Sequence, residues 1–169
     1  MIHLNIGSNL NSAYGSKFEN ISIAVKQLIN SKLKIKKISN FFETPSYPNK
    51  KNPMFVNVGL IAEFNSNYDS LLNEILLIEK KIGRVRKKKN DPRVCDIDII
   101  DYNGLIKRND NLELPHPRAH NRNFVLYPIK ELDPNWIHPI LKKNVDFLIN
   151  ELSQISRIEI TRLSKSVII

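Results

Sequence analysis

The sequence predicts an α+β fold, in which an antiparallel sheet carries helices packed on it. Apolar residues recur at helical spacing in two segments, and four shorter segments are rich in β-branched and aromatic residues. These segments follow one another in the order β-α-β-β-α-β. A chain of 169 residues without an internal repeat or a long linker is expected to form a single domain over residues 1–169.

The first three elements occupy the N-terminal part of the chain. Residues 2–6 predict a strand that ends at the turn-forming sequence Gly-Ser-Asn at 7–9. Residues 31–42 predict the second strand, with apolar side chains among lysines. Between the two strands a helix is expected, whose apolar stripe is formed by Phe18, Ile21, Ala24, Val25, Leu28 and Ile29.

A proline-rich loop separates the second strand from the third. Residues 43–53 contain three prolines and predict this loop. Residues 54–64 have strong β character and predict the third strand. Residues 68–82 predict an amphipathic helix, which either Asn67 or Asp69 could cap.

With a fourth strand near residue 96, these elements give the ferredoxin-like arrangement, an antiparallel sheet with helices on one face. A C-terminal extension follows this core. Its expected parts are a tight hairpin turn at Asn103-Gly104, an irregular segment over 114–118, a helix over 124–132 interrupted by Pro128, a helix over 145–152 and a strand over 158–163.

The composition favours a globular protein with anionic ligands. The chain carries 26 Lys and Arg against 17 Asp and Glu, and this net charge of +9 favours nucleotides, nucleic acid or an acidic surface as partners. A single cysteine cannot form an intrachain disulfide and suits a reducing cytosol, so we expect a cytoplasmic protein. The N-terminal residues lack the features of a signal peptide, and no apolar run reaches the length of a membrane span.

Two carboxylates in an apolar run are the most informative feature of the chain. In a strand, Asp96 and Asp98 point to one face, and Cys95, Ile97 and Ile99 point to the other. Two adjacent carboxylates repel each other unless a cation neutralises the pair or the two share a proton. Cys95 is expected in the core and not among metal ligands, because it faces away from the pair.

A basic loop over residues 84–93 precedes this strand. Acidic oxygens that can hold Mg²⁺, beside cations that can hold phosphate, are the arrangement that phosphoryl transfer needs. Each signal alone is weak, because a D-x-D strand often faces solvent and a run of lysines is usually a solvated face. Together they favour a polyphosphate site.

Side-chain charge has to bind the phosphates, since the chain lacks both glycine-rich phosphate-binding motifs and has only five glycines. The arginine guanidinium can donate two parallel hydrogen bonds to phosphate, and the candidates are Arg84, Arg86, Arg93 and Arg122. For each of them the alternative is a surface salt bridge. His116 stands between two prolines that stiffen the backbone, which suits a fixed donor to phosphate; a structural surface histidine is the competing interpretation.

Three further residues point to a flat ring as a second ligand. Phe55 and Phe124 are core residues by default. Asn57, however, interrupts an apolar strand and shares a face with Phe55, and a buried amide needs hydrogen-bond partners. A heterocycle with amide-like edges would supply them.

Taken together, these residues resemble the 6-hydroxymethyl-7,8-dihydropterin pyrophosphokinase family of folate biosynthesis. The similarity covers about the first three quarters of the chain in the family's order and spacing, and the segment P-R-x-x-D-[I/L]-D is close to a family signature by itself. The matching segments are Ile6–Leu10, Phe42–Pro45, Phe55–Asn57, Gly83–Arg86, Pro92–Ile99, Leu114–Pro117 and Asn121–Phe124.

The resemblance implies an enzyme that moves a diphosphate from ATP to the hydroxymethyl group of a reduced pterin and releases AMP. It implies two Mg²⁺ ions held by Asp96 and Asp98, and stabilisation of the transferring group by Arg84 and Arg93. The implied ATP-binding residues are Glu79, Arg86, Ile99, His116 and Arg122. The implied pterin-binding residues are Thr44, Pro45, Phe55, Asn57 and Phe124. We expect a monomer that acts on these small molecules, with neither nucleic acid nor a membrane as partner.

The basic loop departs from the family pattern, because Asn90-Asp91 stands where members often carry a tryptophan, and the loop is shorter. This difference concerns how the loop would close over the substrates. From about residue 135 the resemblance is weak, and it implies nothing for the remainder of the extension.

Two other functions fit parts of the pattern. A nucleotidyltransferase also combines a Gly-Ser turn with a D-x-D strand, but there the two lie close in sequence, whereas Gly7 and Asp96 are far apart. An RNA-binding module can use the same scaffold and would suit the net charge of +9. It needs an aromatic run on its central strands that is missing here, and Asp96 and Asp98 would repel a phosphate backbone without metal.

Overall fold

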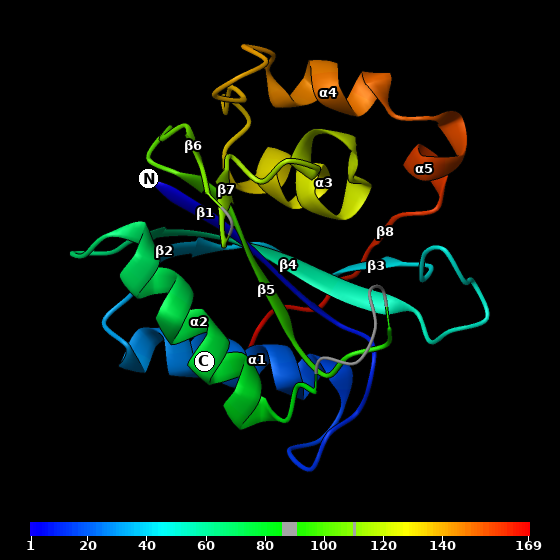
Figure 1. Cartoon of the computed structure of the whole chain (residues 1–169). Helices are drawn as coiled ribbons and strands as arrows, with labels where there is room; N and C mark the ends of the chain where they lie inside the picture. The colour runs from blue at the N-terminus through cyan, green and yellow to red at the C-terminus, as the bar shows by residue number, and fades with distance from the viewer. Residues whose placement is uncertain (86–90, 110) are drawn as a thin grey trace.

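The computed structural model describes residues 1–85, 91–109 and 111–169 (Figure 1). The strands are β1 (Ile2–Ser8), β2 (Lys34–Ile38), β3 (Phe42–Thr44), β4 (Phe55–Glu63), β5 (Asp96–Tyr102), β6 (Lys107–Arg108), β7 (Glu113–Leu114) and β8 (Thr161–Arg162). The helices are α1 (Lys17–Asn30), α2 (Tyr68–Ile82), α3 (Asn123–Leu132), α4 (Val145–Glu151), α5 (Gln154–Ile158) and the 3₁₀ helix η1 (Ala119–Asn121). Within the described ranges, no helix combines the length and the apolar character needed to cross a membrane.

The main sheet has the strand arrangement that the sequence predicts. β1 pairs with β4 on one side and with β5 on the other, and both contacts are antiparallel. Along its other edge, β4 pairs with β2 and with β3, and the short β8 pairs with β3. The α+β, ferredoxin-like core is confirmed, and β6 and β7 form a separate small hairpin that the sequence does not reveal.

The strand expected over residues 31–42 is wrong in its bounds, because it is divided into β2 and β3. Between the two, Ser39 Oγ accepts the backbone N–H of Gly59 at 2.9 Å, so a side chain interrupts the regular ladder. The loop expected over 43–53 also begins later than predicted, since β3 continues to Thr44. Thr44 is therefore fixed by the sheet.

The two faces of the sheet carry different layers, with α1 and α2 against one face and α3 and α4 over the other (Figure 1). Alternation along β1 sends Ile2, Leu4 and Ile6 into the larger core, which α1 and α2 close. The intervening residues Asn5 and Gly7 belong to the opposite face. The same alternation in β4 and β5 places their polar residues beside those of β1.

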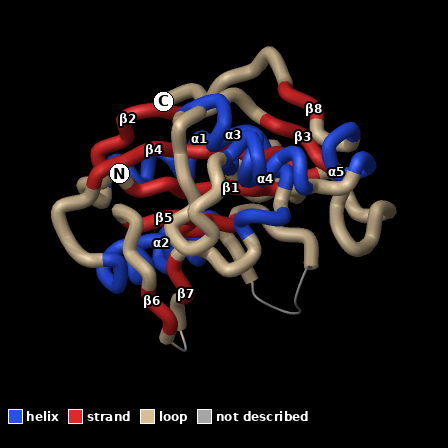
Figure 2. The backbone as a smooth tube through the Cα atoms, turned by 90° about the horizontal axis from the view of Figure 1, so that it is seen from above, coloured by secondary structure: helices blue, strands red, loops and turns tan. Residues whose placement is uncertain are grey.

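The C-terminal extension covers only part of this second face, as the view from above shows (Figure 2). Ile100 of β5 is buried in a second core with Leu126 of α3 and Leu148 of α4. At the other end of the strands, Phe55 and Asp96 line a cavity instead. The helices predicted on one face are thus joined by a second helical layer, which leaves the polar end of the sheet open.

Side chains and a glycine define the ends of the two long helices. Ser16 and Glu19 form a capping box at the start of α1. Of the two candidates for α2, Asn67 is the cap, since its Oδ1 accepts the backbone N–H of Ser70 at 2.9 Å. Gly83 ends α2 with φ of 100°, a conformation that favours glycine, and the chain turns there into the basic loop.

Two expectations for the extension are wrong. α3 is continuous through Pro128, whose ring lies against Gly59, where the sheet has no side chain. The strand expected over 158–163 is reduced to β8, and Ile158 ends α5 instead. Ile158 is 72% exposed, so its apolar character does not indicate a buried strand.

The tight turn expected at Asn103-Gly104 is present, but the hairpin expected around it is not. Both residues have positive φ angles, 56° and 72°, as the mirror-image turns of this kind require. The strand that follows, however, is paired within the small hairpin and not with β5.

We expect Gly59→Ala to destabilise the protein by about 1–3 kcal/mol. A Cβ at this position would lie 2.8 Å from Cβ of Pro128 and 3.3 Å from Cδ1 of Leu132, so the sheet and α3 would have to move apart. Urea unfolding measures the loss. The exposed Lys34→Ala on β2 is the control, with an expected change within about 0.5 kcal/mol. Equal stability of the two variants would contradict the close packing.

Candidate active site

Asp96 and Asp98 lie on one face of β5, as their spacing predicts, and both are half-buried. Ile97 is buried in the larger core on the other face. Cys95 is fully buried, and burial raises the pKa of its thiol well above the usual range. The prediction that Cys95 is a core residue is confirmed.

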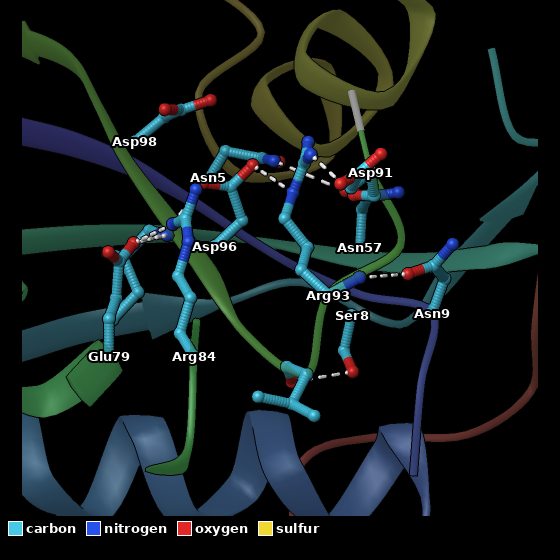
Figure 3. Close-up of polar contacts among 12 residues, drawn as sticks. Asn5, Ser8, Asn9, Asn57, Glu79, Arg84, Asp91, Arg93, Asp96 and Asp98 are labelled. Atoms are coloured by element: carbon cyan, nitrogen blue, oxygen red, sulfur yellow. Dashed lines mark hydrogen bonds and ion pairs between the residues drawn. The ribbon is translucent and has the colours of Figure 1, made fainter. Parts of the chain in front are cut away.

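Asp96 is held between two arginines (Figure 3). Its Oδ1 accepts a hydrogen bond from Nη1 of Arg84 at 2.6 Å, and its Oδ2 lies 2.7 Å from Nε of Arg93. Arg84 also donates to Glu79, a carboxylate only 2% exposed, which accepts the backbone N–H of Ile97 at 2.8 Å. Burial lowers the pKa of Arg84, but the charges of Asp96 and Glu79 outweigh it and raise that pKa above its usual value. Glu79 thereby connects α2, Arg84 and β5.

Asp98 is neutralised less completely. Nη1 of Arg122 lies 3.4 Å from its Oδ2, and Nε2 of His116 lies 3.9 Å away. Burial, followed by the charge of Asp96, raises the pKa of Asp98 to about 6. A bound cation would relieve the unfavourable ionisation of this second carboxylate.

His116 is positioned as a neutral donor. Its Nδ1 accepts the backbone N–H of Arg118 at 3.1 Å, so the ring proton of the neutral form is on Nε2. Burial, and then the charges of Arg122 and Arg118, lower the pKa of His116 to about 4. The ring is therefore uncharged at neutral pH, and its Nε2 lies beside Asp98 and Arg122.

The carboxylate pair fits Mg²⁺ when a phosphate supplies the remaining ligands. Among the residues that the structure describes, no group of three or more His, Cys, Asp or Glu side chains is placed to hold a metal ion. Mg²⁺ commonly binds through one or two carboxylates and takes its other oxygens from water and phosphate. Asp96 and Asp98, with the raised pKa of Asp98, have the oxygen donors and the uncompensated charge for such an ion.

Two cavities meet at these carboxylates. The larger has a volume of about 530 Å³, and its polar lining includes Glu79, Arg84, His116 and Arg118, with Ile99 among its apolar residues. The smaller has a volume of about 110 Å³ and extends over the ends of β1, β3 and β4. Both are lined by Arg93, Asp96, Asp98 and Arg122. These four residues therefore form the junction between the cavities.

Two aromatic rings line the smaller cavity, one from the sheet and one from α3. Phe55 lies at the start of β4, and Phe124 lies in the first turn of α3. The guanidinium carbon of Arg93 is 5.1 Å from the ring centre of Phe55, and that of Arg122 is 5.4 Å from the ring centre of Phe124. The rings therefore adjoin the junction, and aromatic rings suit the binding of a flat heterocycle.

The floor of the smaller cavity is an amide pair. Nδ2 of Asn5 donates to Oδ1 of Asn57 at 3.3 Å, and both side chains are almost fully buried. Oδ1 of Asn5 and Nδ2 of Asn57 have no hydrogen-bond partner among the described residues. A buried polar atom left in this state costs about 1–3 kcal/mol, so the cavity offers one acceptor and one donor to a ligand.

The Gly-Ser-Asn turn at 7–9 connects the loops around the site (Figure 3). Ser8 Oγ donates to the carbonyl of Val94 at 2.8 Å, and Asn9 Oδ1 accepts the backbone N–H of Arg93 at 2.7 Å. Nδ2 of Asn9 donates to the carbonyl of Pro53 at 3.1 Å. This turn fixes the backbone of Arg93 relative to β1 and to the loop after β3.

The structure brings together those predicted site residues that it describes. The larger cavity is lined by the predicted residues Glu79, Arg84, Ile99 and His116. The smaller one is lined by Thr44, Pro45, Phe55, Asn57 and Phe124. Arg86, the remaining predicted residue, lies outside the described residues.

Sequence reasoning missed Asn5, which lines the smaller cavity. The signal was present, because Asn5 interrupts the apolar strand β1 in the same way that Asn57 interrupts β4. A polar residue inside a short N-terminal strand is less conspicuous than one in the long, strongly apolar β4.

The chain is similar to proteins of one family. The family model for 7,8-dihydro-6-hydroxymethylpterin-pyrophosphokinase (HPPK) matches residues 3–134. A 2-amino-4-hydroxy-6-hydroxymethyldihydropteridine pyrophosphokinase of Aquifex aeolicus is 35% identical over 142 residues, which are 84% of this chain and 86% of that protein. The folic acid synthesis protein FOL1 of Dictyostelium discoideum is 40% identical over 141 residues, and these cover 83% of this chain but 21% of that longer protein.

The fold is also similar to that of a solved structure. The crystal structure of Plasmodium falciparum HPPK-DHPS matches 89% of this chain and 44% of that chain, with a TM-score of 0.65 and 16% sequence identity. A variant of that protein with three substitutions, solved with pterin and p-hydrobenzoate, matches 95% of this chain and 47% of that chain, with a TM-score of 0.67 and 15% identity. At these identities the likeness shows a shared fold.

We expect Asp98→Asn to raise the stability of the ligand-free protein at neutral pH. Burial and Asp96 raise the pKa of Asp98 to about 6 in the folded protein, from an ordinary value of 3.8. Between about pH 4 and pH 6 the folded state therefore holds this proton more tightly than the unfolded chain, and stability falls as the pH rises. Asp98→Asn removes this titration. The free energy of unfolding of the variant should therefore rise relative to that of the wild type, by about 1–3 kcal/mol over that window.

Urea unfolding between about pH 4 and pH 8, with EDTA present, measures this difference. Asp69→Asn is the matched control, because it removes an exposed carboxylate outside the two cavities. A difference between Asp98→Asn and the wild type that stays constant over the whole pH range would contradict the electrostatic origin of the effect.

Proposed function

The chain belongs to the 7,8-dihydro-6-hydroxymethylpterin-pyrophosphokinase family, and on that premise we propose that it transfers a diphosphate from ATP to 6-hydroxymethyl-7,8-dihydropterin. The products are AMP and the pterin diphosphate, and the reaction is a step of tetrahydrofolate biosynthesis. The observation that supports this proposal is the meeting of two cavities at Asp96, Asp98, Arg93 and Arg122. Transfer between two bound molecules requires adjacent binding sites with the reacting groups at their junction.

The larger cavity suits ATP. Arg84 and Arg122 supply positive charge, and neutral His116 offers a donor on Nε2, as a triphosphate requires. Glu79 and Ile99 line the same cavity. By family resemblance Arg86 contacts the triphosphate as well.

The smaller cavity suits the pterin. Phe55 and Phe124 would hold the ring between them, and Asn57 has a free donor for its polar edge. Thr44 and Pro45 line the cavity from the end of β3, where backbone groups can read the same edge. This assignment places the hydroxymethyl group toward the junction, because the carboxylates are shared by both cavities.

Two Mg²⁺ ions would be held by Asp96 and Asp98 together with the phosphates, and they would neutralise the charge that develops on the triphosphate. In the structure Arg84 and Arg93 both contact Asp96. Once a cation neutralises Asp96, these guanidinium groups are available to phosphate oxygens. Arg84 carries its positive charge at neutral pH, as a guanidinium does, and in the ligand-free structure Asp96 and Glu79 raise its pKa further.

In the reaction, the hydroxyl oxygen of the pterin forms a bond to the β-phosphorus of ATP. The bond from that phosphorus to the α,β-bridging oxygen breaks, AMP leaves with the electron pair, and the hydroxyl proton passes to water. Arg84 and Arg93 stabilise charge on the transferring group, while Phe55 and Phe124 position the nucleophile. Catalysis here consists of positioning and charge neutralisation.

The chain is organised as a single functional unit. Residues 1–169 form one pterin diphosphokinase domain, which Ile100 supports, since this residue of the central sheet packs in the core of the extension. The enzyme acts as a cytoplasmic monomer on small molecules, without nucleic acid or a membrane. Its one cysteine, the buried Cys95, is in keeping with a reducing compartment.

We expect the protein to form AMP from ATP and Mg²⁺ only when 6-hydroxymethyl-7,8-dihydropterin is present, in equal amount with pterin diphosphate. Chromatographic separation of the nucleotides and pterins measures both products. ADP in place of AMP would indicate transfer of a single phosphoryl group and would refute the proposed reaction.

Asp96→Ala should lower turnover at least about a hundredfold, with only a modest loss of pterin affinity.

We expect Phe124→Ala to weaken pterin binding about ten- to a hundredfold, while the affinity for a non-hydrolysable ATP analogue changes little. Stacking on an aromatic ring contributes about 1–3 kcal/mol per base by alanine substitution, and the same range applies to a pterin. Titration calorimetry measures both affinities. Phe147→Ala on α4, which removes a half-exposed ring outside both cavities, is the matched control. Equal weakening of both ligands by Phe124→Ala would make this ring a core residue.

A further inference from the structure

We propose that Asn5 is a specificity-determining residue for the pterin, and that its Oδ1 accepts a hydrogen bond from a ring N–H of that substrate. The inference rests on the proposed function, because it concerns the ligand of the smaller cavity. Asn5 is 4% exposed and lines this cavity from the middle of β1. Its Oδ1 is buried and has no hydrogen-bond partner in the described part of the chain.

The strand register explains why Asn5 turns toward Asn57. Across the sheet Asn5 is paired with Gly59 of β4, which has no side chain, and with Asp98 of β5. Asn57 lies two residues before Gly59, so the two amides are diagonal neighbours on one face. Their hydrogen bond of 3.3 Å uses Nδ2 of Asn5 and Oδ1 of Asn57.

Gly7 makes room for this arrangement. It is paired with Asn57 across the sheet, and a Cβ on Gly7 would lie 2.7 Å from Oδ1 of Asn57. A side chain at position 7 would therefore require the amide of Asn57 to shift from the position in which it accepts from Asn5. The glycine therefore leaves the space that the amide of Asn57 occupies beside Asn5.

The atoms that remain are complementary to the edge of a pterin. The pair presents one acceptor, Oδ1 of Asn5, beside one donor, Nδ2 of Asn57. A pterin carries ring N–H groups beside a carbonyl and imine nitrogens, so a donor and an acceptor lie side by side along its edges. A flat ring without an N–H at this edge would leave Oδ1 of Asn5 buried and unpaired, and the site discriminates against such a ring.

Asn5→Ala should weaken binding of 6-hydroxymethyl-7,8-dihydropterin at least about tenfold, with less than about a twofold change for a non-hydrolysable ATP analogue. Titration calorimetry measures both affinities. Asn5→Leu, which keeps the side-chain shape without the oxygen, should give the same result and serves if the alanine variant does not fold. Asn20→Ala is the matched control: Asn20 is also fully buried, but it bonds to Leu10 and Ser12 outside the cavity.

A pterin series separates a direct contact from an effect that passes through Asn57. The probes are 6-hydroxymethyl-7,8-dihydropterin, its N3-methyl derivative and fully oxidised 6-hydroxymethylpterin, which lacks the N8 hydrogen. One of the two altered pterins should bind to the wild type at least about tenfold more weakly than 6-hydroxymethyl-7,8-dihydropterin does. For the same altered pterin, the affinity of Asn5→Ala should fall less than about twofold. Equal losses in the wild type and in Asn5→Ala for both altered pterins would overturn the inference.

The outcomes for the two proposals are distinct. A folded wild type that does not bind 6-hydroxymethyl-7,8-dihydropterin would refute the proposed function itself. Tight binding by the wild type, retained in a folded Asn5→Ala or Asn5→Leu, would refute only the role of Asn5. Asn57→Ala provides the reference for losing the donor of the pair, because it removes the partner of Asn5 and leaves the acceptor in place.

Discussion

The repulsion between Asp96 and Asp98 is the constraint on which the rest of the site depends. Strand alternation puts both carboxylates on one face of β5, and their surroundings must neutralise them. Arg84 and Arg93 contact Asp96, Arg122 lies beside Asp98, and the pKa of Asp98 still rises to about 6. The same guanidinium groups line the larger cavity, so the residues that balance the carboxylates are also the ones that can bind phosphate.

The sheet positions these groups, and they are accessible because only part of its second face is covered. α3 packs closely over Gly59, where the sheet has no side chain, and the extension builds its own core around Ile100. Beyond the end of this layer, the strands β1, β4 and β5 present their polar residues to the two cavities. The turn at 7–9 then fixes the neighbouring loops to β1 through hydrogen bonds of Ser8 and Asn9.

Two features of the site lower the stability of the ligand-free protein. One is the ionisation of a half-buried carboxylate beside another, and the second is the amide pair with its unpaired acceptor and donor. Both are relieved by ligands of complementary chemistry, a divalent cation with phosphate and a ring with N–H and carbonyl groups. The residues that reduce the stability of the ligand-free protein are therefore the residues of the proposed function. Functional sites commonly reduce stability in this way.

The sequence alone determined the features that depend on near neighbours along the chain. The alternation of Asp96 and Asp98 is local, so a short-range pattern was enough to predict it, and the same kind of pattern narrowed the cap of α2 to Asn67 or Asp69. The tertiary structure decided what depends on contacts between distant segments: the break at Ser39, the continuous helix at Pro128, and the pairing of Asn5 with Asn57. Each of these involves Gly59 or its strand, and no local pattern reveals which side chain another segment will bring there.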